Sequence, residues 1–211
     1  MFLQAKSHLT MSNKWTRIVQ CYGLIQDPSN GNYMLVMRLM DINLRKYLQQ
    51  HQITWKEKIH IVRKITKALY QVHRDNAVHR DLHSGNILYL QPQNDWFISD
   101  FGFCGPADKP LKSVYGNLPY IAPEVIIGKE YTFASDIYSI GILMWEISSG
   151  QLPFNNFEHN YDLAMRIVTS GLTRDQNALR SFEFVGGELR KFALYDITRL
   201  ILSTPILRNS L

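Results

Sequence analysis

Three oxygen-bearing side chains stand near the ends of two predicted short strands. Asp81 and Asn86 lie in a polar loop that leads into the apolar run Ile87–Leu90, and Asp100 follows the run Trp96–Ser99. If the two strands pair as a hairpin, the ends carrying Asn86 and Asp100 lie side by side. Carboxylate and amide oxygens suit Mg²⁺, which proteins usually hold with few groups plus phosphate oxygens. Asp81 would then lie near the metal as a base for a hydroxyl substrate, although each residue taken alone is better explained as an ordinary turn residue.

The elements that position these loops are a small β part followed by a large helical part. Residues 18–25 and 33–39 predict a hairpin around the turn-forming segment 27–32. Thr54–Glu57 has the pattern of a capping box that begins a helix. The predicted apolar face of this helix consists of Trp55, Ile59, Val62, Ile65, Leu69 and Val72. The run Asp136–Ile147 is apolar on nearly every side and predicts a buried central helix.

Composition excludes several classes of protein. With 45% hydrophobic and 19% charged residues, the chain is expected to form a packed core. The net charge of +5 is scattered without a basic run, so we expect no nucleic-acid partner, and a mildly basic surface is the favoured explanation. Cys21 and Cys104 form no CxxC pair, which suits a reducing compartment and a cytoplasmic location. The longest apolar stretch, 137–147, is shorter than the ~18 residues of a membrane span, and the oligomeric state stays open.

Three short motifs follow one another in a recognisable order. His79–Asn86 resembles the protein-kinase catalytic loop HRDLxxxN, Asp100–Gly102 resembles the DFG motif, and Ala122–Glu124 resembles the APE motif. One tripeptide alone is weak evidence, but the three in this order at kinase-like separations are specific. Ser135–Gly141 and Gly150–Phe154 resemble the start of the central helix of that family and the stretch after it.

The resemblance to protein kinases runs from about residue 2 to residue 169. It implies an α+β fold, mainly the helical C-terminal lobe, at residues 41–169, preceded by a remnant of the β-rich N-terminal lobe and hinge at residues 1–40. Residues 170–211 form a tail that does not resemble the family, and Ser170–Gly171 is expected to end the last family-like helix.

Roles for the polar residues follow from the resemblance. Asp81 would orient the substrate hydroxyl and accept its proton, while Asn86 and Asp100 would hold Mg²⁺ on the phosphates of ATP. Arg80 would pair with a phosphate on the activation segment, for which Ser113 and Tyr115 are candidate sites. Asp136 would tie down the catalytic-loop backbone from beneath.

The nucleotide base has its own predicted contacts. Met37 falls at the gatekeeper position, the backbone from Arg38 to Met40 would meet the adenine, and Leu88 would form the floor of its pocket. For Met37 and Leu88, plain core packing is an equally good explanation.

Two substitutions alter the substrate side of the pattern. Gly116–Glu124 is similar to the docking loop of Ser/Thr and tyrosine-kinase-like enzymes, but Asn117 replaces the usual Thr. His83 replaces the usual Lys and would offer a phosphate only a weaker, pH-dependent charge. The resemblance therefore implies transfer of the ATP γ-phosphate to a Ser/Thr hydroxyl of a protein substrate, with Tyr less favoured.

Other departures favour a second hypothesis. We find no Gly-rich phosphate loop or strand lysine, and Gln4 stands near the place of the expected Glu. No Arg-Pro follows residue 170 as a partner for Glu124, so that carboxylate is expected to lack its ion pair. A non-catalytic, pseudokinase-like binding or scaffold module is therefore the alternative to an active Ser/Thr kinase.

Overall fold

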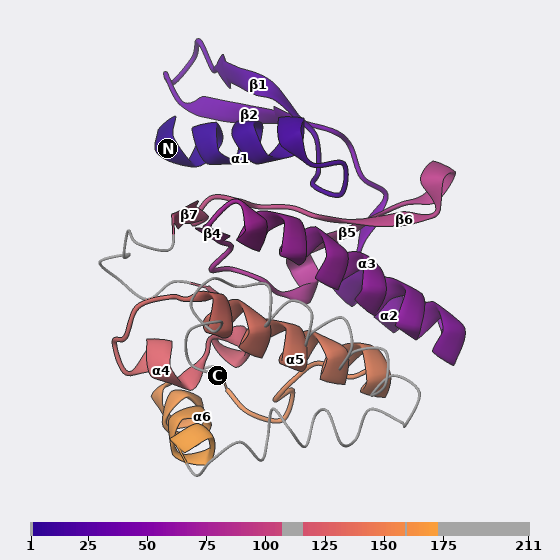
Figure 1. Ribbon diagram of the computed structural model, residues 1–211, viewed down its shortest axis with the longest axis vertical. Coiled ribbons are helices and arrows are strands. Elements are labelled where there is room, and N and C mark those ends of the chain that lie inside the picture. The colour runs from indigo at the N-terminus through magenta and orange to yellow at the C-terminus, as the bar shows by residue number, and fades with distance from the viewer. Residues whose placement is uncertain (1, 107–115, 159, 173–211) are drawn as a thin grey trace.

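Residues 2–106, 116–158 and 160–172 are described in the computed structural model of the chain, which combines helices with short β-sheets (Figure 1). The helices are α1 (Phe2–Lys14), α2 (Leu44–Gln50), α3 (Trp55–Arg74), α4 (Pro123–Ile126), α5 (Phe133–Ser149) and α6 (Tyr161–Leu172). The strands are β1 (Cys21–Gln26), β2 (Tyr33–Met37), β3 (Ile42–Asn43), β4 (Ala77–Val78), β5 (Ile87–Leu90), β6 (Asp95–Ile98) and β7 (Gly105–Pro106). None of the described helices is long and apolar enough to span a membrane.

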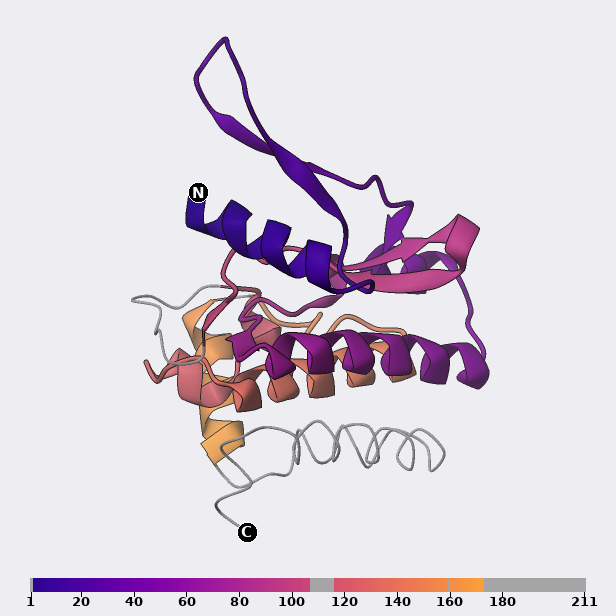
Figure 2. The same ribbon diagram turned by 45° about the horizontal axis from the view of Figure 1, so that its top comes forward.

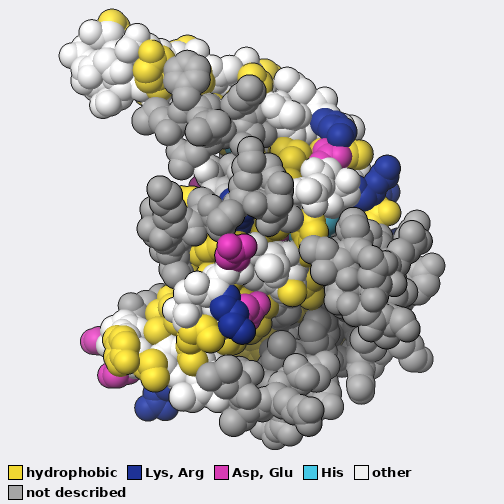
Figure 3. Space-filling model, turned by 60° about the vertical axis from the view of Figure 1, so that its left-hand side comes forward, with side chains coloured by type: hydrophobic (Ala, Val, Ile, Leu, Met, Phe, Trp, Pro, Cys, Tyr) yellow, Lys and Arg dark blue, Asp and Glu magenta, His cyan; other side chains and the backbone are white. Residues whose placement is uncertain are grey.

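The first helix and the first hairpin form the small part of the fold. α1 runs from Phe2 to Lys14 without an interrupting Gly or Pro. β1 and β2 pair antiparallel, with a bulge between Cys21 and Gly23, and α1 packs against β1. This hairpin projects from the rest of the molecule (Figures 2 and 3).

Both faces of the β1–β2 hairpin leave apolar side chains in solvent, since consecutive residues such as Tyr33 and Met34 point to opposite faces. Exposed large hydrophobic residues on the two strands are Tyr22, Ile25, Tyr33, Met34 and Val36. Among the described residues, β2 pairs with β1 and with no second strand. A two-stranded sheet of this kind is marginally stable on its own, so α1 supplies much of the support for the hairpin.

The helical part is built around α3 and α5, which lie side by side (Figure 2). Thr54 and Glu57 form the predicted capping box at the start of α3. α5 begins with a second capping box, Thr132 with Ser135, and ends at Gly150, whose φ of +72° is the left-handed conformation that Gly adopts readily. The shared core includes Leu44, Val62, Ile65, Leu69, Ile98, Ile140, Leu143 and Ile147. The predicted central buried helix is therefore confirmed.

Two details of the helix predictions are wrong. Trp55 does not belong to the apolar face of α3, since 51% of it is exposed. It is the first residue of the helix, ahead of the first core residue Ile61, and the ammonium of Lys58 lies 4.8 Å from its ring centre. The break predicted at Ser170–Gly171 also fails, because α6 continues to Leu172. Gly171 is the next-to-last residue of α6, so the helix passes the predicted break by one residue. The remainder of the predicted tail lies outside the described residues.

The strands that carry the polar loops form a three-stranded sheet in the order β3-β5-β6. β5 and β6 pair antiparallel, as predicted, with Ile87 opposite Ile98. The backbone N–H of Ser99 donates to the carbonyl oxygen of Asn86 at 2.9 Å, so the two strand ends are adjacent. This adjacency brings the two polar loops to one edge of the sheet.

Candidate active site

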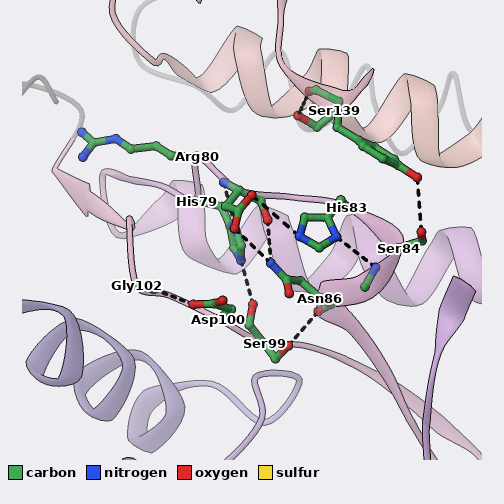
Figure 4. Close-up of polar contacts among 12 residues, drawn as sticks. His79, Arg80, His83, Ser84, Asn86, Ser99, Asp100, Gly102 and Ser139 are labelled. Atoms are coloured by element: carbon green, nitrogen blue, oxygen red, sulfur yellow. Dashed lines mark hydrogen bonds and ion pairs between the residues drawn. The ribbon is translucent and has the colours of Figure 1, made fainter. Parts of the chain in front are cut away.

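Asp81 and Asn86 contact each other within one loop. The loop between β4 and β5 contains a 3-10 turn at Ser84–Asn86, which returns the chain toward Asp81. The side-chain nitrogen Nδ2 of Asn86 donates to the carbonyl oxygen of Asp81 at 2.9 Å and to its Oδ2 at 3.3 Å (Figure 4). These hydrogen bonds fix the two predicted functional side chains relative to each other.

Asp100 follows β6, and its charge reaches Asp81. Burial, and after it the negative charge of Asp100, raises the pKa of Asp81 to about 6. Ser99, the residue before Asp100, donates its N–H to the carbonyl oxygen of Asn86 at 2.9 Å, so Asp100 follows directly on a contact with the loop of Asp81 and Asn86. The three predicted side chains, Asp81, Asn86 and Asp100, therefore lie around one region, while their roles stay predictions.

The backbone immediately before Asp81 is held from beneath by α5. Arg80 has a φ of +74°, in a region that residues with side chains seldom occupy. The carboxylate of Asp136 accepts hydrogen bonds from the backbone N–H groups of Arg80 and His79 at 2.9 and 2.8 Å, and contacts Nε2 of His73 at 2.9 Å. These bonds confirm the predicted tie between Asp136 and the loop backbone.

Three rings in edge-to-face contact connect α1 to the same loops. Phe101 is fully buried, and its ring centre lies 5.3 Å from that of His8 and 4.7 Å from that of His79. Nε2 of His8 lies 3.0 Å from the carbonyl oxygen of Val19. The conformation of Asp100, with a φ of +57°, is therefore anchored by a neighbour that packs against both the small and the helical part.

His83 is close to Asp81 but is not a cation in this setting. Burial, and after it the charge of Arg45, lowers the pKa of His83 to about 4. Nδ1 accepts a hydrogen bond from the backbone N–H of Gly85 at 3.0 Å, so the proton of the neutral ring is on Nε2. Nε2 lies 3.7 Å from Oδ1 of Asp81. The ring thus offers an N–H donor where a Lys would offer a full charge.

The side-chain oxygens near Asp81 suit a Mg²⁺ ion that is also bound to the phosphates of a nucleotide. Nδ2 of Asn86 donates hydrogen bonds to Asp81. The side-chain oxygen of Asn86 accepts a hydrogen bond from none of the described residues, so it is available to a metal ion. Oδ1 of Asp100 accepts from the N–H of Gly102 at 3.1 Å, and the side chain is exposed. The described residues contain no cluster of three or more His, Cys, Asp or Glu side chains suited to a metal. Two protein ligands are nevertheless enough for Mg²⁺ when phosphate oxygens supply others, and the cation would relieve the repulsion between the two carboxylates.

The predicted adenine contacts lie together at the junction of the two parts. Met37, Met40 and Leu88 are half-buried and pack against Val19, Leu90 and Phe97. The N–H of Arg38 donates to Gln20 at 2.8 Å, whereas the backbone of Met40 bonds to none of the described residues. Unused backbone groups beside an apolar patch suit a flat, polar-edged ring such as adenine.

The predicted docking loop lines a small pocket beside Asp81. The pocket walls include Asp81, Gly116, Asn117 and Tyr120. Gly116 has a φ of +117°, and a Cβ there would lie 3.1 Å from Oδ1 of Asp81, so a side chain would crowd the carboxylate. Glu124 is half-buried and forms no ion pair with the described residues.

The regulatory predictions are tested only in part. The guanidinium of Arg80 donates to the carbonyl oxygen of Phe103 at 3.2 Å, which directs it toward the start of the predicted activation segment (Figure 4). Ser113 and Tyr115 lie outside the described residues.

Sequence reasoning missed three residues that support the site. His8 is buried in α1 and His73 in α3, where no polar contact was predicted, and Ser99 donates from Oγ to the carbonyl oxygen of Asn86 at 3.1 Å. For His73 a signal existed, because a polar residue directly follows Val72 on the apolar face of α3. The contact of His8 with Phe101 joins residues far apart in the chain and left no local signal.

The comparisons with known proteins identify the family of the chain. The family model described as protein kinase domain matches residues 5–193. The chain therefore belongs to the protein kinase domain family, and its predicted α+β kinase-like fold is confirmed.

Individual relatives extend the comparison. A putative mitogen-activated protein kinase kinase kinase 7-like protein of Drosophila melanogaster is 33% identical over 75% of this chain and 42% of its own length. Calcium-dependent protein kinase 5 of Plasmodium falciparum is 33% identical over 76% of this chain and 28% of its own length. A probable serine/threonine-protein kinase, pknA2, of Bifidobacterium longum is 32% identical over 72% of this chain and 20% of its own length. The chain thus spans less than half the length of each of these relatives.

Proposed function

We propose that this chain forms the catalytic lobe of a protein kinase that transfers the γ-phosphate of ATP to a Ser or Thr hydroxyl of a protein. The observation that carries the proposal is the hydrogen-bonded pair Asp81–Asn86. Asp100 lies at the adjacent strand end, and its negative charge helps to raise the pKa of Asp81. The names of Ser/Thr kinases among its relatives support the choice of hydroxyl. The cysteine pattern favours the cytoplasm as the location.

In this proposal Asp81 positions the attacking hydroxyl and accepts its proton. Its pKa of about 6 leaves it ionised at neutral pH but basic enough to take a proton from a developing alkoxide. Asn86 holds the carboxylate in place through Nδ2, and the neutral His83 presents its Nε2 proton beside Oδ1. When bound, Mg²⁺ would neutralise charge on the ATP phosphates, held by the oxygens of Asn86 and Asp100.

A transfer assay tests the proposal. We would join the chain to the small lobe of a related kinase, so that the phosphates have a Gly-rich loop and a lysine, and supply radiolabelled ATP and a protein mixture. Label on Ser and Thr, abolished by Asp81→Asn, is the expected result. The matched control is Asp162→Asn, an exposed acid on α6. Transfer that survives Asp81→Asn would refute the role of Asp81.

A pseudokinase-like scaffold is the second candidate, favoured by the neutral imidazole of His83 in the place of a cation. The same assay separates the two hypotheses. A scaffold would bind nucleotide or partner without transferring label, even when its small lobe is complete.

A further inference from the structure

The outer face of α3 carries five cationic or titratable residues in one line. They are Lys56, His60, Arg63, Lys67 and Arg74, which we call the basic stripe, and all are exposed. Their spacing of four, three, four and seven residues places them on one side of a helix, opposite the buried face that includes Val62 and Leu69. The stripe is about 27 Å long at the usual rise of a helix.

Nearby acids do not neutralise the stripe. The only acidic residue of α3 is Glu57, whose carboxylate is used by Thr54 in the capping box. Asp95 contacts Arg17 and Lys64, and Asp75 contacts Lys14. Among the described residues, no member of the stripe forms an ion pair. Burial, and after it the cations Lys64, Arg17 and Arg63, lower the pKa of His60, and the charge of Asp95 opposes them without reversing the direction.

Helix stability explains only Arg74, a cation in the last turn of α3, where the helix dipole favours it. Like charges spaced by three or four residues, such as Arg63 and Lys67, repel each other and weaken a helix. Lys56 lies in the first turn of α3, where the helix dipole disfavours a cation. The arrangement therefore opposes local stability at two places, as expected for a surface kept for binding.

We propose that the basic stripe of α3 docks an acidic segment of a partner protein. Charge complementarity is the argument, since a segment carrying Glu or Asp along one side matches the line of cations. No member of the stripe is apolar, so nothing there would enter a bilayer. No member is Phe, Tyr or Trp, and His60 is the single ring in the line, so the stripe lacks the series of stacking platforms that successive nucleic-acid bases need. The proposal is independent of the proposed phosphotransfer.

The test compares two double charge reversals of the whole chain. Lys56→Glu with Arg63→Glu disrupts the stripe, places an acid in the first turn of α3 and sets Glu four residues before Lys67, so folding is expected to be preserved or improved. Lys46→Glu with Lys129→Glu changes two exposed lysines elsewhere and removes the same formal charge. Thermal melting checks that both variants fold.

The probe is a fluorescein-labelled helical peptide with Glu repeated every three or four residues, read by anisotropy at physiological salt. Its control is the same peptide with Gln at each Glu. We expect the stripe variant to bind the Glu peptide at least about tenfold more weakly than the unchanged chain, and the Lys46/Lys129 variant to change by less than about twofold. Equal losses in both variants would overturn the proposal. It would also be overturned if phosphatidylserine vesicles or single-stranded RNA bound more tightly than the peptide and lost binding with the stripe variant.

Discussion

The carboxylate of Asp136 holds Arg80 in a left-handed conformation. Its Oδ1 accepts the N–H of Arg80 at 2.9 Å, and the φ of Arg80 is +74°. Such a conformation costs about 1–3 kcal/mol and persists only where the surroundings enforce it. Arg80 directly precedes Asp81, the candidate base. Asp136 in α5 therefore fixes the backbone conformation that orients the side chain of Asp81.

Replacing Asp136 should destabilise the chain. Asp136→Ala would leave two backbone N–H groups and His73 without their acceptor, at an expected cost of about 3 kcal/mol, seen by urea unfolding. Glu130→Gln, at an exposed acid, is the matched control. Equal stability of the Asp136 variant and the unchanged chain would show that the tie is unimportant.

The same carboxylate predicts a dependence on pH. Burial alone would raise the pKa of Asp136, but its bond and charge interaction with His73 and its backbone donors lower it below the ordinary value. A carboxylate with a lowered folded pKa contributes stability above its unfolded pKa of about 3.9, and that contribution is lost as the pH falls further. The stability difference between the unchanged chain and Asp136→Asn should therefore shrink below about pH 4. A difference that stays constant down to pH 3 would contradict this.

Asp81→Asn should stabilise the fold while removing activity. The raised pKa of Asp81 means that its charged form is disfavoured at neutral pH, so removing the charge should add about 1–2 kcal/mol. The gain should be largest above pH 7 and should fall as the pH drops through about 6, where Asp81 takes up a proton. Calorimetric melting between pH 5 and pH 8 measures it. A lower melting temperature at pH 8 would argue against the repulsion from Asp100.

His83→Lys should strengthen binding of ATP phosphates. The present ring is neutral because burial and Arg45 lower its pKa to about 4, whereas Lys would bring a permanent charge beside Asp81. We expect about tenfold tighter Mg–ATP binding by calorimetry, from one new charge-assisted hydrogen bond. His83→Gln keeps a neutral donor and should leave the affinity near its starting value. No gain with Lys would place the phosphates away from residue 83.

The chain by itself, without an added small lobe, should bind Mg–ATP weakly. The residues proposed to form the hinge and to bind the metal are in the chain, but we find no Gly-rich loop or strand lysine in its sequence, and each missing charge-assisted contact costs about 1.5–3 kcal/mol. A dissociation constant near the millimolar range is expected from calorimetry. Low-micromolar binding would show that other groups hold the phosphates.

The chain sequence predicted some parts of this site better than others. The adjacency of Asn86 and Asp100 could be predicted because the two strands are joined by a short turn, and strands joined in this way usually pair with each other. The tie from Asp136 to the loop was available only through the resemblance, because 56 residues separate it from Arg80. The contact of His8 with Phe101 depends on how α1 packs, which no local pattern specifies.

The central claim is that Asn86 and Asp100 bind the metal of a metal–nucleotide complex beside Asp81. Its most direct test is the paramagnetic broadening of backbone amide NMR signals by Mn²⁺ added with ATP to the isotope-labelled chain. The account predicts broadening centred on residues 81, 86 and 100–102, lost in Asp100→Asn and kept in Asp162→Asn. Broadening centred elsewhere, or unchanged by Asp100→Asn, would contradict it.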